Sequence, residues 1–222
     1  MASGAVRPVV TLAALYGAGG GIVGSRVAER LGVPFLDRKI PETVAERAGL
    51  SHSAVAAVDD GPRAGAGRFV SSLGRASTIV GGDAVSLGQL DLQGRAIRAH
   101  IEEFLARARE TGGVVLGRGG MVVLQGSPTA LHVHLRGDRE ARLRQAMSIE
   151  GIDRATAERR QTSEDDARRS YVRRAYGVDG EDPALYHLVV DSTELSLDAC
   201  VDLIVAASRA RVELATSSAG TG

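Results

Sequence analysis

Five glycines stand close together in residues 16–25, YGAGGGIVGS, directly after the apolar run Val9–Leu15. The apolar run is typical of a buried strand, and Gly20–Leu31, with its apolar residues on one stripe, is typical of a helix. Backbone N–H groups of a glycine loop at a helix start bind phosphate well, because no Cβ blocks close approach. The pattern predicts an anion-binding loop whose cofactor-binding residues are Gly17, Ala18, Gly19, Gly20 and Gly21.

Two other interpretations of this loop stay open. Gly19–Gly24 matches the dinucleotide fingerprint G-x-G-x-x-G, and Asp37 follows the next strand, where a ribose-binding acid would lie. That interpretation leaves only Ser25–Leu31 for the helix, which is short for a helix that must cross a sheet. No Tyr-x-x-x-Lys pair serves hydride chemistry, because Lys39 is the only lysine. The third interpretation is a tight turn with no ligand.

Arginine carries nearly all the positive charge, since Lys39 is the only lysine among 27 basic residues. Arg118 follows a predicted strand, at the edge where open α/β sheets bind ligands. Seven arginines lie between 154 and 174, and Arg169 and Arg173 share a helix face at i, i+4 spacing. Guanidinium groups bind phosphate and stabilise a transferring phosphoryl group. The competing interpretation of this arginine-rich stretch is a solvated helix balanced by its own acids.

Other reactive side chains point to structural roles. His132 and His134 alternate on a predicted strand and so share one face, but no third metal ligand lies nearby in sequence. Cys200 stands on an apolar helix face and is expected to be buried and inert. Asp191–Thr193 is predicted to be a turn and helix cap. We therefore predict no metal ion held by protein ligands alone.

The elements that must position these groups follow from the apolar periodicity. Strands are predicted at Val9–Leu15, Pro34–Leu36, Val114–Leu116, Leu131–Leu135 and Leu188–Val190. Helices are predicted at Gly20–Leu31, Pro41–Ala48, 95–110, Arg139–Ile149, Arg154–Ala175 and Leu197–Val212. Strands separated by helices indicate an α/β fold with a parallel sheet covered on both faces. We expect one domain over 9–213, an irregular insertion at 59–94, and disordered tails at 1–8 and 214–222.

Composition narrows the class of protein. The formal net charge is zero, which argues against generic nucleic-acid binding. No apolar run reaches the roughly 18 residues that span a bilayer, and no secretory signal is visible, so we expect no membrane association. A single cysteine suits a reducing compartment, so we expect a cytoplasmic protein.

Four stretches in order resemble the cytidylate kinase-like family, a branch of the nucleoside monophosphate kinases, over about residues 9–207. They are YGAGGGIVGSRVAERLGVPFLDR, GGVVLGRGGMVVLQGSPTALHVHLRGDREARLR, DDARRSYVRRAYGVDGEDPALYHLVVDS and STELSLDACVDLIV. The resemblance implies a three-layer P-loop kinase fold with a five-stranded parallel sheet. It also implies phosphoryl transfer from ATP, with Mg²⁺, to a pyrimidine nucleoside monophosphate. The third stretch resembles the arginine-rich lid, predicted here at 150–182.

The resemblance also assigns residues. Asp37, Arg38 and Arg118 match substrate-binding positions, and a helix cap is the alternative role for Asp37. The lid arginines match only as a group; from it we take Arg168 as a candidate for substrate binding, and Arg169 and Arg173, with Arg118, as candidates for catalysis. The chain departs from the family pattern at several places: Gly20 occupies the usual P-loop lysine position, Gly21 the Mg²⁺-binding Ser/Thr position, and Gly119 the place of an acid after Arg118. Two functions follow: a nucleotide kinase, or a kinase-fold protein that binds nucleotide with little or no transfer. An NAD(P)-dependent oxidoreductase ranks third.

Overall fold

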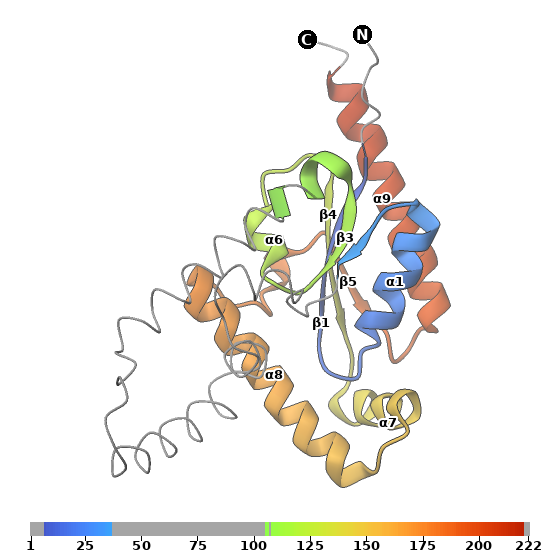
Figure 1. The fold of residues 1–222 in the computed structure, drawn as a ribbon, viewed down its shortest axis with the longest axis vertical. Helices are drawn as coiled ribbons and strands as arrows, with labels where there is room; N and C mark the ends of the chain where they lie inside the picture. Colours follow the sequence, from blue (N-terminus) through green and yellow to red (C-terminus); the bar gives the residue numbers. More distant parts are fainter. Residues whose placement is uncertain (1–6, 37–104, 107, 220–222) are drawn as a thin grey trace, which may run out of the picture.

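Five parallel strands form one sheet in the computed structural model, which describes residues 7–36, 105–106 and 108–219 (Figure 1). The strands are β1 (Val9–Ala14), β2 (Phe35–Leu36), β3 (Gly113–Leu116), β4 (Ala130–Arg136) and β5 (Leu188–Asp191). Their order is β2-β3-β1-β4-β5, and every neighbouring pair is parallel. All five strands were predicted from the sequence, and the parallel arrangement is confirmed.

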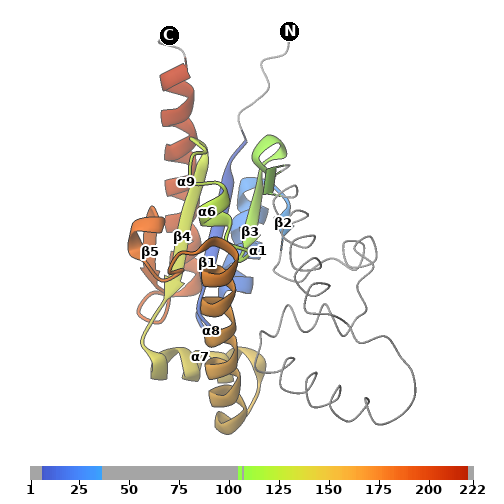
Figure 2. The ribbon, with the colours of Figure 1, turned by 90° about the vertical axis from the view of Figure 1, so that its left-hand side faces the viewer.

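Helices cover both faces of this sheet. Successive strand residues point to opposite faces, so Val10 and Leu12 of β1 enter the core beneath α1 (Gly20–Leu31) and α9 (Leu197–Ala219). Figures 1 and 2 show these two helices side by side against the sheet. Thr11 points to the other face, where the short helix α6 (Gly120–Val123) packs closely enough that a Cβ on Gly120 would touch it.

Two further helices lie beyond the carboxyl ends of the strands. Figure 1 shows α7 (Arg139–Glu150) and α8 (Arg154–Tyr176) as a hairpin across that end of the sheet. The Asp138 side chain caps α7 by accepting hydrogen bonds from two first-turn amides, and Asp153 caps α8 by accepting one. Glycines in the left-handed region end both helices. The α7–α8 hairpin therefore faces the loops that follow the carboxyl ends of the strands.

One predicted boundary is wrong. We expected a disordered tail from residue 214, but α9 continues to Ala219. The run after Val212 is rich in alanine and serine, which tolerate helix well enough to continue one that is already nucleated. The predicted helix Pro41–Ala48 and the 59–94 insertion lie outside the described residues, as does most of the helix predicted at 95–110. No helix in the part of the chain that the structure describes is long and apolar enough to cross a bilayer.

Candidate functional site

The glycine loop connects β1 directly to the start of α1. Gly17 and Gly19 adopt φ values of 79° and 72°, a conformation that favours glycine, and Gly19 is the N-cap of the helix. The first amides of α1, at Gly20, Gly21 and Ile22, have no intrahelical acceptor. Because α1 begins at Gly20, the G-x-G-x-x-G match lies largely inside the helix. The structure therefore favours the helix start that the phosphate interpretation predicts.

The glycines serve protein packing more than we expected. A Cβ added to Gly17 would lie 2.1 Å from the Arg142 carbonyl oxygen, and one on Gly19 would lie 2.8 Å from Leu197. A Cβ on Gly20 would lie 2.5 Å from the Ala14 Cβ, whereas a Cβ on Gly21 would meet nothing within 4 Å. From the sequence we expected all these glycines to serve the close approach of a ligand. Only Gly21 fits that reason alone, since the other three are also fixed by their protein neighbours.

A second tight turn follows β3. Gly117, Arg118 and Gly119 all have positive φ, and Arg118 is the only non-glycine residue among the described ones with that conformation, at φ 63°. The Tyr176 hydroxyl donates to the Arg118 carbonyl at 3.0 Å, and Gly117 N–H donates to Leu12 O at 2.8 Å. A non-glycine residue held in this region costs about 1–3 kcal/mol and is found mainly at functional sites.

Gly17, Gly19, Gly20 and Gly21 of the glycine loop line the same cavity as the Arg118 turn, with a volume of about 480 Å³. Ala18, which we predicted to bind the cofactor, is fully buried and does not line this cavity. Arg168 and Arg169 of α8 line it as well, but Arg173 does not and is exposed to solvent. Of Arg169 and Arg173, which share a helix face, only Arg169 therefore reaches the cavity. Other lining groups include the four carboxylates Glu150, Glu164, Asp165 and Glu181, and the aromatic residues Tyr16, His134, Tyr171 and Tyr186.

The lining arginines of α8 are paired with carboxylates. Arg168 donates to Glu164 at 2.9 Å and to Asp165 at 3.3 Å. Arg169 donates to Glu181 at 3.0 Å, and that carboxylate raises the pKa of the guanidinium. The sequence left two interpretations of these arginines open, a phosphate-binding face and a helix balanced by its own acids. The structure shows a balanced helix, so a bound phosphate must compete with these acids.

The tyrosine that opens the loop joins the same electrostatic network. The Tyr16 hydroxyl donates to Glu150 at 3.0 Å, and Arg160 donates to the same carboxylate oxygen at 2.7 Å. Burial, together with the Glu150 carboxylate, raises the pKa of Tyr16 to about 12. The hydroxyl therefore stays a neutral donor at physiological pH and adds no negative charge to the cavity wall.

Four residues that we did not predict anchor the glycine loop. Arg142 Nη1 donates to Tyr16 O at 2.6 Å, and Tyr16 N–H donates to Asp165 Oδ1 at 2.7 Å. Gln145 Nε2 donates to Gly17 O, and Ser192 Oγ donates to Ala18 O, both at 2.9 Å. In sequence, Arg142 is one of many arginines, and Asp165 is one of the acids assumed to balance α8. No sequence signal marks either as a loop contact.

The remaining candidates behave as structural groups. His132 is buried, shares a 2.8 Å hydrogen bond with Thr11 and stacks on His187, while His134 stacks on Tyr186. Among the residues that the structure describes, no cluster of His, Cys, Asp or Glu is arranged to hold a metal. Cys200 is free and fully buried, as predicted. Asp191 accepts from the Thr193 N–H and hydroxyl, which confirms the predicted turn. The predicted helix cap at Asp191–Thr193 is wrong, because α9 begins at Leu197 and its first-turn Ala199 N–H donates to the Ser196 hydroxyl.

Three candidates cannot be placed. Asp37, Arg38 and Lys39 lie outside the described residues, so the predicted acceptor contacts of Asp37 and Arg38 stay predictions.

Comparison with known proteins decides the family. A model of the cytidylate kinase-like family matches residues 9–194. The chain belongs to the cytidylate kinase-like family. This confirms the resemblance drawn from the sequence, and the five-stranded parallel sheet with its helices is that of a P-loop kinase fold.

Three solved structures are similar to this cytidylate kinase-like chain, and the one from Eubacterium ventriosum shares its fold. An uncharacterized protein from Eubacterium ventriosum ATCC 27560 matches with a TM-score of 0.62 and 16% identity, over 91% of this chain and 99% of that one. A gluconokinase from Sinorhizobium meliloti 1021 matches at 0.49 and 17%, over 96% and 98%. A shikimate kinase from Bacteroides thetaiotaomicron matches at 0.48 and 17%, over 89% and 96%. No curated protein sequence matches significantly.

Proposed function

We propose that this protein transfers a phosphoryl group from ATP, as its Mg²⁺ complex, to a nucleoside monophosphate. The observation that carries the proposal is the common cavity lined by the glycine loop, Arg118, Arg168 and Arg169. Phosphoryl transfer asks little covalent chemistry of the protein; it requires donor and acceptor held in line and positive charge around the transferring group. A cavity that brings the glycine-loop backbone and these guanidinium groups together supports the proposal.

The roles follow from position. The amides at the start of α1 and the positive helix end would hold the donor phosphates. Arg118, at the carboxyl end of β3, would hold the acceptor phosphate, and Arg168 and Arg169 would stabilise the charge that develops between the two. A phosphate oxygen of the acceptor would attack the γ-phosphorus of ATP. The bond between the γ-phosphorus and the oxygen that bridges it to the β-phosphate would break, and ADP would leave with that oxygen. Asp37 and Arg38 stay the predicted acceptor-side contacts.

The residues present fit Mg²⁺ only as part of the nucleotide complex. Gly21 offers no hydroxyl at the usual Ser/Thr position, and no metal-binding cluster stands among the described residues. Mg²⁺ commonly keeps several waters and binds through substrate phosphates and one or two carboxylates. When bound, the ion would neutralise the phosphate oxygens. The carboxylates that line the cavity are the available protein partners.

A second candidate function is nucleotide binding with little transfer. It is favoured by Gly20, where the Ala14 Cβ at 2.5 Å leaves no room for the loop lysine. The carboxylate pairs of Arg168 and Arg169 point the same way, because they must be exchanged before the arginines reach a phosphate.

ADP release in a coupled assay separates the two candidates. Wild type would be tested with Mg·ATP and a panel of nucleoside monophosphates, beside Arg118→Ala and the control Arg209→Ala, whose exposed side chain lies on α9 away from the cavity. The proposal predicts acceptor-dependent ADP release that Arg118→Ala lowers at least about tenfold, the scale of one lost charged hydrogen bond. Background release with every acceptor, while Mg·ATP still binds, would leave only the binding function. Binding of NAD in place of ATP would reject both.

A further inference from the structure

The glycine loop is fixed by a buried ion pair that spans both helices of the hairpin. Arg142 of α7 and Asp165 of α8 lie 2.9 Å apart, and their side chains are only 7% and 12% exposed. The pair holds the backbone of one loop residue from both sides: Arg142 donates to Tyr16 O, and Asp165 accepts from Tyr16 N–H. Gln145, one turn after Arg142, donates to the next carbonyl, at Gly17.

These tethers fix the directions of the loop amides. In a planar trans peptide the C=O and the following N–H point in opposite directions. Because the Arg142 guanidinium holds the Tyr16 carbonyl, the Gly17 N–H points away from that guanidinium. Ser192 holds the Ala18 carbonyl and so turns the Gly19 N–H away from the β5 end. The amides of two glycines that line the cavity are therefore oriented by side chains from distant parts of the chain.

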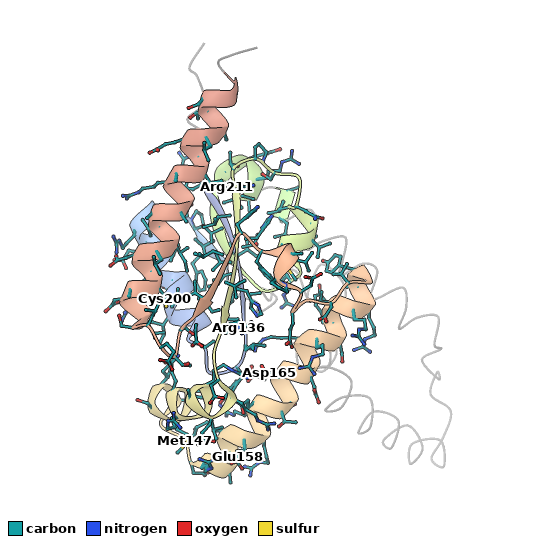
Figure 3. All side chains as sticks on the ribbon, turned by 180° about the vertical axis from the view of Figure 1, so that it is seen from behind. Arg136, Met147, Glu158, Asp165, Cys200 and Arg211 are labelled. Atoms are coloured by element: carbon teal, nitrogen blue, oxygen red, sulfur yellow. The ribbon has the colours of Figure 1, made fainter. Side chains whose placement is uncertain are left out.

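The same carboxylate reaches the arginines of the cavity. Asp165, at the middle of α8 and labelled in Figure 3, also accepts from Arg168 at 3.3 Å through the oxygen that holds Tyr16 N–H. Gly17 allows this close docking, because a Cβ there would collide with the Arg142 backbone. One ion pair thus links the loop amides to a phosphate-binding candidate on α8.

We propose that Arg142 and Asp165 are positioning residues that preorganise the glycine loop and couple it to α8, a role whose effect on nucleotide binding rests on the proposed function. They touch no reacting atom; they act through the Tyr16 peptide groups and Arg168. A buried ion pair can often be replaced by apolar residues without loss of stability. If the pair only holds the fold together, such a replacement should leave the loop amides and nucleotide affinity unchanged, whereas a positioning role predicts that both change. Such a replacement separates the two roles.

The test is Arg142→Met/Asp165→Leu, which removes the pair without leaving one charge buried. The matched control is Arg154→Met/Glu140→Leu, which removes an exposed ion pair that also joins α8 to α7. Three quantities are compared with wild type: Tm, amide hydrogen exchange in residues 15–21, and the Kd of Mg·ATP. We expect Arg142→Met/Asp165→Leu to stay folded, to exchange its loop amides faster, and to bind Mg·ATP about tenfold more weakly. A tenfold change is the effect of losing one or two charged hydrogen bonds. The control should match wild type in loop exchange and affinity.

Each other result speaks against the proposal. Unchanged loop exchange and affinity in a folded double variant would reduce the pair to a fold-holding role, and tighter Mg·ATP binding would make Asp165 a competitor of phosphate. If the double variant does not fold, Asp165→Asn is compared with Asp165→Leu. Asn retains the acceptor for Tyr16 N–H and Leu removes it, so the loop amides should exchange faster in Asp165→Leu than in Asp165→Asn, and equal or slower exchange in Asp165→Leu would overturn the proposal. If wild type binds no Mg·ATP, the proposed function fails, and loop exchange alone still decides whether the pair holds the loop.

Discussion

Parallel substitutions of Gly20 and Gly21 test where a cation can enter the site. A Cβ on Gly20 would lie 2.5 Å from the Ala14 Cβ and 3.2 Å from a Leu116 methyl, while a Cβ on Gly21 would meet nothing within 4 Å. Overpacking of that kind costs about 1–3 kcal/mol. Replacing a helical glycine by alanine gains up to about 1 kcal/mol in helix propensity. Gly20→Ala should therefore be less stable than wild type by about 1 kcal/mol, and Gly21→Ala should be slightly more stable.

The same geometry predicts that a lysine can reach a bound phosphate from position 21 but not from position 20. Gly21→Lys would place an ammonium group in the cavity, where a charged hydrogen bond to phosphate contributes about 1.5–3 kcal/mol. Ordering the side chain and placing a cation at a helix start oppose this by about 1 kcal/mol. The net effect should tighten Mg·ATP binding about tenfold relative to Gly21→Gln, a neutral control of similar length.

Thermal denaturation and calorimetric titration read both effects. For a chain of this size, 1 kcal/mol shifts Tm by about 2–4 °C. The Tm values of Gly20→Ala and Gly21→Ala should therefore differ by roughly 5 °C, with Gly21→Ala higher. Equal Tm values, together with equal Mg·ATP affinities of Gly21→Lys and Gly21→Gln, would refute the assignment of position 21 to the open cavity.

Three further predictions concern the supports of the site. Burial, aided by the charges of His187 and Arg211, lowers the pKa of His132 to about 4. As pH falls, the unfolded state takes up this proton first, near pH 6.5, so the contribution of neutral His132 to stability is fully present above that pH and is lost as pH falls toward 4. His132→Asn should flatten this part of a Tm–pH profile, and an unchanged slope would contradict the prediction. Arg118→Gly should melt about 2–4 °C above Arg118→Ala, because only glycine adopts φ 63° without strain, and the reverse order would show that the turn is unstrained. Ser192→Ala should lower stability by about 1–3 kcal/mol in urea denaturation and speed loop exchange, since it leaves the buried Ala18 carbonyl without its donor; a variant as stable as wild type would mean that this bond holds nothing.

The element pattern of this protein could be predicted from the sequence. Buried parallel strands read as short apolar runs, and α1 shows a clear apolar stripe, so its start at Gly20 followed from periodicity and length. Those signals are local. The end of α9 was missed because Ala and Ser after Val212 are weak signals of either helix or tail.

The site was only partly predictable, because its contacts join distant residues. Arg118, Arg168 and Arg169 were predicted as site residues and line the cavity. The pairing of Arg168 with Glu164 and Asp165 is local to α8 and was one of the sequence interpretations, whereas the pairing of Arg169 with Glu181 and the orientation of α8 depend on tertiary packing. Arg142 is buried by its contact with Tyr16, more than a hundred residues away, and an arginine's burial leaves no mark in its own sequence neighbourhood. The glycines were correctly found as special, yet three of them are required by protein atoms as well as by any ligand.

Calorimetric titration of Mg·ATP into wild type and Arg168→Ala/Arg169→Ala tests the central claim most directly. The claim is that loop amides and arginines hold a triphosphate without a loop lysine. It predicts saturable one-to-one binding to wild type, weakened at least about tenfold in the double variant and unchanged in Arg159→Ala, which removes an exposed α8 arginine outside the cavity. Absence of binding to wild type, or equal affinity in all three proteins, would contradict it.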